Sequence, residues 1–157
     1  MPKLLIVYHS MSGNTEQMAK AIAEEVCAVG GTAVQIKKGL EATIDDLLEC
    51  DGVALGSPDY FSDMAGAIKD FFDRTYYPVQ GKVTGKPCVI FDSAGGPPLV
   101  VIESLRTMAK RFELDEIAEP VGASGASSEE ILEQCRQLGR KLAARLKTMQ
   151  EKKGRAI

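Results

Sequence analysis

Short apolar runs rich in β-branched residues alternate with longer amphipathic segments along the whole chain. Runs of the first kind predict buried strands, whereas apolar residues that recur every three or four positions predict helices. The strands predicted in this way cover residues 4–8, 33–36, 53–56, 88–92 and, more weakly, 117–121. This alternation is typical of a parallel sheet whose strands are joined by helical crossovers.

Four long segments carry an apolar stripe at helical spacing. The stripes are Met18, Ile22, Val26 and Val29; Met64, Ile68, Phe71 and Phe72; Val101, Leu105, Met108 and Phe112; and Ile131, Cys135, Leu138, Leu142, Leu146 and Met149. A shorter helix is expected to begin at Thr43, because Thr43 and Asp46 have the spacing of a capping box. Ser127 and Glu130 have the same spacing and predict the start of the last helix.

Five strands and five helices in 157 residues fit one domain, an α/β three-layer sandwich with helices on both faces of a five-stranded parallel sheet. Right-handed crossovers leave two common strand orders, 3-2-1-4-5 and 2-1-3-4-5, which the strand count does not separate. We expect the domain to span residues 1–151 and residues 152–157 to form a frayed basic tail.

Composition narrows the class of protein. No apolar run approaches the ~20 residues of a membrane span, and the first residues do not resemble a signal peptide, so we expect a cytoplasmic protein without membrane attachment. A net charge of −3 argues against nucleic acid as a partner. The four cysteines form no CxxC pair and the chain has one histidine, which predicts neither a metal site nor a disulfide framework.

The loop after the first strand points to a bound phosphate. It reads His9-Ser10-Met11-Ser12-Gly13-Asn14-Thr15 and leads directly into an amphipathic helix. Hydroxyl groups and backbone N–H groups at a helix N-terminus suit a terminal phosphate, and a glycine lets the backbone fold around it. The bland alternative is an ordinary capped helix start. Neither a GxxxxGK[ST] nor a GxGxxG pattern is present, so this loop does not predict a nucleoside triphosphate or a dinucleotide.

Two further loops follow the third and fourth strands and are expected at the same edge of the sheet. The second loop places Tyr60 and Phe61 just before a helix, where a flat heteroaromatic ligand could stack on them; the alternative is that they pack on the core and a neighbouring loop. The third loop combines small residues with the pair Gly95-Gly96, which lets backbone amides approach a ligand, although a simple flexible turn is the alternative.

These loops resemble a known family. Ser10-Met11-Ser12-Gly13-Asn14-Thr15 is similar to the S/T-x-S/T-G-N-T phosphate loop of flavodoxins. The segment G-S-P-D-Y-F-S-D-M resembles the G-[ST]-P-x-Y-F-G-N-M loop of the flavodoxin-like NAD(P)H:quinone oxidoreductases of the tryptophan-repressor-binding-protein type. The resemblance covers almost the whole chain and favours the strand order 2-1-3-4-5.

The resemblance implies a flavin mononucleotide (FMN) cofactor and assigns residues to it. The phosphate would be held by Ser10, Met11, Ser12, Gly13, Asn14 and Thr15. The isoalloxazine ring would be bordered by Pro58, Asp59, Tyr60 and Phe61 on one side and by Ser93, Ala94, Gly95 and Gly96 on the other. No residue is expected to act as a catalytic acid or base, because FMN itself supplies the redox chemistry.

Some positions depart from the family pattern. The chain has no Trp, so the Trp/Tyr sandwich of many flavodoxins is absent. Ser62-Asp63 replaces Gly-Asn, which changes a side-chain contact to the ring, and Ser62 is expected to hinder the peptide flip into positive φ that would hydrogen-bond a protonated flavin N5. The long insertion that supports tetramers in the quinone reductases is missing, so we expect a monomer or a small homo-oligomer.

Two functions from different classes fit this sequence. The first is an enzyme in which NADH or NADPH reduces FMN, which then reduces a quinone or a similar small acceptor. The second is a flavodoxin-type carrier that moves electrons between redox proteins. The small net charge and the missing Trp favour the reductase, since carriers of this kind resemble strongly acidic, Trp-containing proteins.

Overall fold

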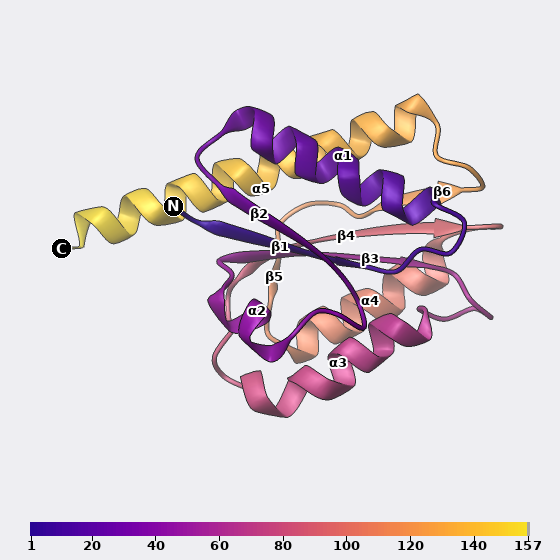
Figure 1. Ribbon diagram of the computed structural model, residues 1–157, viewed down its shortest axis with the longest axis horizontal. Helices are drawn as coiled ribbons and strands as arrows, with labels where there is room; N and C mark the ends of the chain where they lie inside the picture. Colours follow the sequence, from indigo (N-terminus) through magenta and orange to yellow (C-terminus); the bar gives the residue numbers. More distant parts are fainter. Residues whose placement is uncertain (157) are drawn as a thin grey trace.

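The computed structural model describes residues 1–156 as a parallel sheet covered by helices on both faces (Figure 1). Its elements are β1 (Lys3–Tyr8), α1 (Asn14–Val29), β2 (Ala33–Lys38), α2 (Ile44–Glu49), β3 (Gly52–Pro58), α3 (Gly66–Val79), β4 (Pro87–Ala94), α4 (Leu99–Arg111), β5 (Asp115–Glu116), β6 (Val121–Ser124) and α5 (Glu129–Arg155). The three-layer α/β sandwich predicted from the sequence is therefore confirmed.

The strand order of the sheet is β2-β1-β3-β4-β5, with all pairs parallel. This is the 2-1-3-4-5 order, and it places β1 and β3 side by side. The helix after β1 lies on one face of the sheet and the helix after β3 lies on the other (Figure 1). The carboxyl ends of these two strands form a topological switch point, where ligands bind in open α/β sheets.

The fifth strand differs from the expected one. Instead of one strand over residues 117–121, two short segments, β5 and β6, pair with β4 at different heights. Pro120 lies between them and has no N–H to donate to a neighbouring strand. The prediction was correct about the position of this strand beside β4 and wrong about its bounds.

Alternating strand residues divide the interior into two cores. Leu5 and Val7 face α3 and α4, while Leu4, Ile6 and Tyr8 face α1 and α5. Because helices cover both faces, β1, β3 and β4 are buried at nearly every position. The same alternation decides which side of the sheet each residue near the strand ends faces.

The helix starts show one confirmed prediction and one correction. Thr43 caps α2 in a complete capping box with Asp46, as expected. The N-cap of α5 is Ser128, whose hydroxyl accepts from the Ile131 N–H, whereas the Ser127 hydroxyl donates to the carbonyl oxygen of Asn14. Ser127 is therefore used for a tertiary contact that its spacing to Glu130 did not predict.

The last helix is longer than expected. α5 continues through Arg155, so the segment predicted to fray from residue 152 is helical there, although it extends past the sheet (Figure 1). Lys152, Lys153 and Arg155 lie in its last turn, where cations stabilise the negative end of the helix dipole. Within residues 1–156 no helix is long and apolar enough to cross a membrane.

Candidate cofactor-binding site

The three loops singled out in the sequence meet at one edge of the sheet. They follow the carboxyl ends of β1, β3 and β4, which are adjacent strands, and they lie at the right-hand end of the molecule in Figure 1. Residues that are far apart in the sequence thus surround one place. A ligand at this edge would contact all three loops.

The first loop leaves the N-terminus of α1 uncapped. Gly13 occupies the N-cap with φ 98°, a left-handed conformation that favours glycine, and no side chain bonds to the first turn from this position. The Ser10 hydroxyl instead accepts from the Gly13 N–H at 3.0 Å and closes the loop on itself. Hydroxyl groups cap α2 and α5, whereas α3 and α4, like α1, have no side-chain cap; of these three, only α1 follows a loop that has glycine at the N-cap with positive φ. The unfilled N-terminus fits an anion, which would accept from the free N–H groups of α1.

A buried hydrogen bond joins the first loop to the third. The Thr15 hydroxyl lies 2.7 Å from the Ser93 hydroxyl, and both side chains are almost completely shielded from solvent. Thr15 is in the first turn of α1 and Ser93 is near the end of β4, across β3. This contact fixes the start of α1 against the strand that leads into the third loop.

The second loop is a tight antiparallel hairpin. Asp59 pairs with Met64, and Tyr60 and Asp63 exchange backbone hydrogen bonds of 3.0 and 3.3 Å. The two residues at its tip, Phe61 and Ser62, have φ values of 58° and 61°. Two positive φ values at the tip are the pattern of a type I′ turn, which matches the twist of the strands that it joins.

Ser62 adopts this turn without a flip. Its backbone already has positive φ, and its N–H donates to Asp59 Oδ1 at 2.8 Å. The hydrogen bond to a charged group offsets the steric cost that an L-residue has in this conformation.

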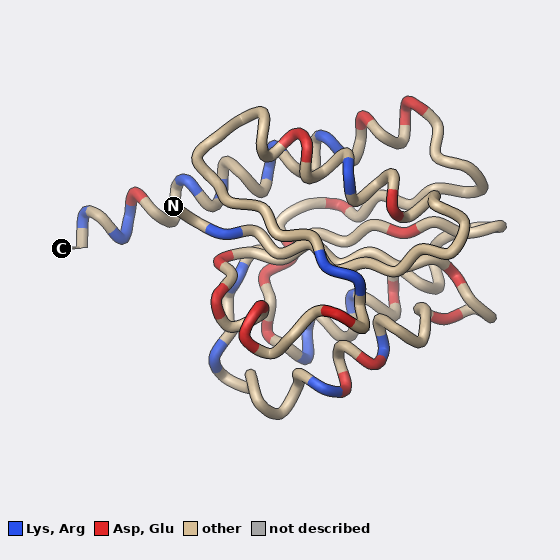
Figure 2. The backbone as a smooth tube through the Cα atoms, in the orientation of Figure 1, with Lys and Arg blue, Asp and Glu red and all other residues tan. Residues whose placement is uncertain are grey.

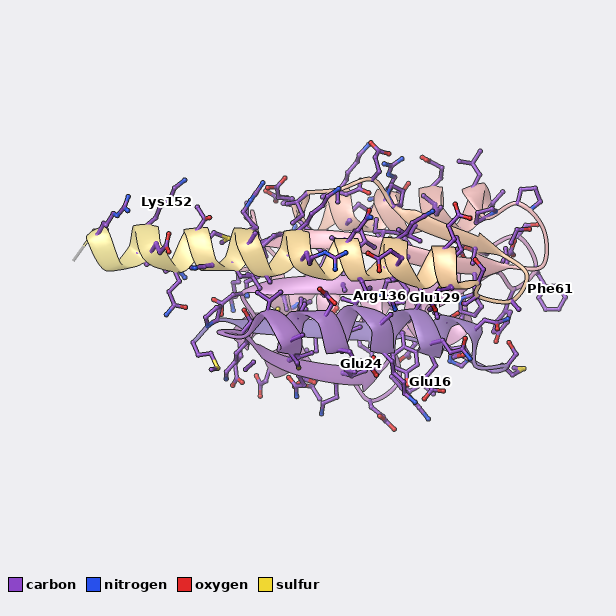
Figure 3. The ribbon with its side chains drawn as sticks, turned by 90° about the horizontal axis from the view of Figure 1, so that it is seen from above. Glu16, Glu24, Phe61, Glu129, Arg136 and Lys152 are labelled. Carbon is purple, nitrogen blue, oxygen red and sulfur yellow. The ribbon has the colours of Figure 1, made fainter. Side chains whose placement is uncertain are left out.

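The two aromatic residues of the hairpin lie differently. Tyr60 is half-buried, and its ring meets the His9 ring edge to face at a centroid distance of 5.7 Å, which links the second loop to the first. Phe61 is fully exposed and projects from the end of the molecule (Figure 3). A large apolar side chain held in solvent at this place is available to a ligand or a partner.

The third loop starts inside the protein and ends on its surface. Ser93 and Ala94 are buried, Gly95 and Gly96 are exposed, and the Asp59 N–H donates to the carbonyl oxygen of Ser93. The predicted site residues therefore divide by depth. Thr15, Pro58, Ser93 and Ala94 form its floor; Ser10, Gly13, Asn14, Asp59 and Tyr60 are half-buried; Met11, Ser12, Phe61, Gly95 and Gly96 are exposed.

Two parts of this edge were not predicted from the sequence. The loop between β6 and α5 lies at the same edge of the sheet. The Ser127 hydroxyl donates to the carbonyl oxygen of Asn14, and the Gly125 N–H donates to the carbonyl oxygen of Ala94. Asp92 is completely buried beside Ser93, and neither of its side-chain oxygens has a hydrogen-bond partner. Burial, followed by repulsion from Asp59, raises the pKa of Asp92 to about 7. The sequence feature that could have identified Asp92 is an acidic residue directly after the apolar run at residues 88–91.

Comparison with known proteins agrees with this geometry. A flavodoxin domain model matches residues 5–94, and the chain belongs to the flavodoxin family. A flavodoxin from Aquifex aeolicus (strain VF5) is 35% identical over 91% of this chain and 86% of its own length. An NAD(P)H dehydrogenase (quinone) from Acidithiobacillus ferrooxidans (strain ATCC 53993 / BNL-5-31) is 33% identical over 59% of this chain and 57% of its own length. Among solved structures, a flavodoxin from the domain Archaea has a TM-score of 0.81 at 25% identity and covers 92% of this chain and 99% of its own.

Membership of this family implies FMN, and the residues present fit it. The uncapped N-terminus of α1, with Gly13 in the left-handed region, suits the phosphate. The exposed aromatic hairpin and the small residues of the third loop suit the two sides of a flat ring.

Proposed function

We propose that this protein binds FMN at the carboxyl edge of its sheet and works as a carrier of electrons between redox proteins. The observation that carries the binding proposal is the uncapped start of α1, fixed to β4 by the hydrogen bond between Thr15 and Ser93. The proposed roles are those assigned from the sequence: residues 10–15 hold the phosphate, and residues 58–61 and 93–96 border the ring.

Bound FMN would supply the electron-transfer chemistry, since it accepts and returns electrons one or two at a time. The chain binds the phosphate through N–H and hydroxyl groups, without a lysine or arginine in residues 9–15. The hairpin and the third loop orient the ring. The exposed side chains at this edge leave room for an electron donor or acceptor to approach.

The charge of the loops at this edge favours a protein partner. Residues 9–15, 57–64, 93–98 and 124–128 contain Asp59 and Asp63 and no Lys or Arg. In Figure 2 these loops are tan and red, and Figure 3 places Lys152 at the opposite end of the molecule from Phe61. An acidic edge attracts a basic redox protein through long-range electrostatics. The net charge of the whole chain is only −3 because residues 129–157 contain more Lys and Arg than Asp and Glu. The total charge therefore does not show that the edge is acidic.

A second candidate function is the NAD(P)H-dependent reduction of quinones or similar small acceptors, which the sequence favoured. It is supported by the resemblance of the second loop to quinone reductases and by the relative named NAD(P)H dehydrogenase (quinone). The lack of Trp also leaves the ring less covered than in a Trp/Tyr sandwich. The cytoplasmic location and the monomeric or small oligomeric state stay predictions.

Stopped-flow mixing separates the two candidates. FMN-loaded protein is mixed anaerobically with NADH or NADPH, and the loss of flavin absorbance is followed. For a carrier we expect no bleaching beyond the rate of free FMN. The protein is then reduced with dithionite and mixed with cytochrome c, a basic electron acceptor, at increasing ionic strength. We expect fast oxidation whose rate falls as salt screens the acidic edge.

Asp63→Asn provides the matched test of docking charge, because Asp63 is an exposed acid at the edge. It should weaken the salt dependence of the cytochrome c reaction. Asp45→Asn makes the same chemical change at an exposed position in α2 and should leave that dependence unchanged. Rapid bleaching by NADH or NADPH would instead assign the protein to the reductases.

A further inference from the structure

Asp92 is a buried carboxyl group that the proposed flavin contacts do not use. It is one residue before Ser93 in β4, its exposed fraction is 0%, and neither oxygen makes a hydrogen bond of normal geometry. The adjacent Ser93 backbone N–H offsets only part of the effect of burial on the Asp92 pKa. A buried polar group is normally hydrogen-bonded, because an unpaired one costs free energy, and an unpaired charge costs more. The exception therefore calls for a functional explanation.

Strand alternation places the Asp92 side chain on the α3 and α4 face of the sheet. Ile90 and Cys88, two and four residues earlier, belong to the core on that face, and Phe91 belongs to the opposite core. The phosphate loop lies on the opposite face, where Ser93 meets Thr15. Asp92 thus lies on the face of the sheet opposite the phosphate loop, next to the loops at residues 59–64 and 93–98 that would border the ring.

The neighbours of Asp92 across the sheet offer it no charge-neutralising group. Its register partners are Ser57 in β3 and Gly122 in β6. The Ser57 hydroxyl accepts from the Ala65 N–H and donates to Pro58. At Gly122, Pro98 approaches so closely that an added Cβ would lie 2.5 Å from its ring. The site is closed by the starts of α3 and α4.

Most titratable groups on the surrounding elements are acidic or already paired. Asp59 follows Ser57 on the same face, and its charge adds to the effect of burial on Asp92. Asp63 accepts from the Met64 N–H at the base of the hairpin. On α3 the first cation is Lys69, paired with Asp73; on α4 Glu103 pairs with Arg106; β6 has no titratable residue; His9 lies across Tyr60 on the phosphate-loop side.

We propose that Asp92 is a proton-linked positioning residue: uncharged, it allows the hairpin at residues 59–64 and the loop at residues 93–98 to close on FMN, and its ionisation opposes that closure. The inference rests on the proposed FMN binding. An ionised Asp92 repels Asp59 and requires water, and both effects act against a dry, closed edge.

The direction of the coupling follows from linkage. FMN would bring a phosphate dianion and displace water at this edge, which disfavours the charged form of a nearby carboxyl group. Binding therefore takes up a proton at Asp92, and FMN binds more weakly as Asp92 ionises. Because the pKa of Asp92 is about 7, this loss falls near neutral pH.

Fluorescence titration of FMN into the full chain tests this coupling between about pH 5.5 and about pH 8.5. The wild-type protein is compared at each pH with Asp92→Asn, which keeps the shape and removes the charge. The ionisation of the FMN phosphate affects both proteins and cancels in the ratio of their dissociation constants. We expect the dissociation constant of the wild type, divided by that of Asp92→Asn, to rise with pH. The total rise should be about tenfold for each unit by which FMN raises the pKa of Asp92.

Asp92→Ser is a second uncharged variant of smaller size, and it should show the same pH profile as Asp92→Asn if charge is the cause. Asp45→Asn is the exposed control and should follow the wild type. A carbon-13 NMR titration of the Asp92 carboxyl group reports its ionisation directly, before and after FMN is added. We expect a transition near pH 7 that moves upward with FMN.

The outcomes separate this inference from the function on which it rests. A constant ratio at all pH values, or an NMR transition at the ordinary pH for aspartate, would overturn the role of Asp92 while leaving FMN binding intact. Absence of FMN binding in every variant at every pH would overturn the proposed function and the role of Asp92 with it.

Discussion

The hydroxyl groups of Thr15 and Ser93 lie 2.7 Å apart although 78 residues separate them in the sequence. The bond joins the helix start that would receive a phosphate to the strand that leads into the third loop. The two elements come together because β1, β3 and β4 are neighbours in the sheet. The phosphate loop is therefore held by the order of the strands as well as by its own turn.

Thr15→Val is expected to weaken FMN binding. The change keeps the shape of the side chain but removes the hydroxyl and leaves Ser93 without its buried partner. The expected loss of binding free energy is about 1 to 3 kcal/mol, the range for a hydrogen bond to a charged group, whereas the unpaired Ser93 hydroxyl lowers the stability of the fold. Titration of FMN by fluorescence measures it. Thr148→Val, at an exposed site in α5 where the hydroxyl bonds within the helix, should leave the affinity unchanged.

FMN is expected to bind more tightly than riboflavin. The two molecules share the ring and differ by the phosphate, which would accept from the free N–H groups at the start of α1. Several hydrogen bonds to a dianion should give at least about a tenfold difference in dissociation constant. Parallel titrations at one pH measure this ratio. Equal affinities would remove the phosphate from the loop at residues 10–15.

The stability of the protein is expected to depend on pH through Asp92. Burial raises the pKa of this group to about 7, above the value of about 3.9 in an unfolded chain. Between these values the folded state binds more protons than the unfolded state, so stability falls as pH rises from about 4 to about 7. The effect is at most about 4 kcal/mol over this range, at about 1.4 kcal/mol for each unit.

Denaturant unfolding of the wild type and Asp92→Asn at several pH values measures this effect. Other titrating groups are common to both proteins, so the difference in unfolding free energy isolates Asp92. We expect the unfolding free energy of Asp92→Asn to increase relative to that of the wild type as pH rises from about 4 to about 7. Above about pH 7 the difference should stay constant. A difference that does not change with pH would show that Asp92 titrates normally.

Ser62→Gly is expected to stabilise the protein slightly. Ser62 has a φ of 61° at the tip of the hairpin, where glycine avoids the steric cost of a side chain. The larger chain entropy of glycine in the unfolded state reduces the gain, which should be about 0.5 to 1 kcal/mol. Ser104→Gly makes the same chemical change inside α4 and should destabilise by about 0.5 kcal/mol. Thermal unfolding that gave both variants the same sign would contradict the role of positive φ.

Local sequence patterns were sufficient to predict most of the secondary structure and the phosphate loop of this protein. Apolar runs and helical stripes predicted the elements, because burial on one or both faces imposes a period that is visible in a single segment. The loop at residues 10–15 predicted a phosphate for a similar reason, since its hydroxyl groups, glycine and following helix are contiguous. The capping box of Thr43 and Asp46 is also complete within four residues.

Only the tertiary structure decided the features that depend on distant partners. The split of the fifth strand into β5 and β6 depends on how each segment meets β4, and the use of Ser127 depends on Asn14, 113 residues away. In the sequence, Asp92 is a polar residue at the end of a predicted strand. It becomes a buried, unpaired acid because β3, β6 and the starts of two helices enclose it. Sequence periodicity records which residues avoid water, whereas a pKa or a cross-sheet hydrogen bond depends on which segments the fold brings together.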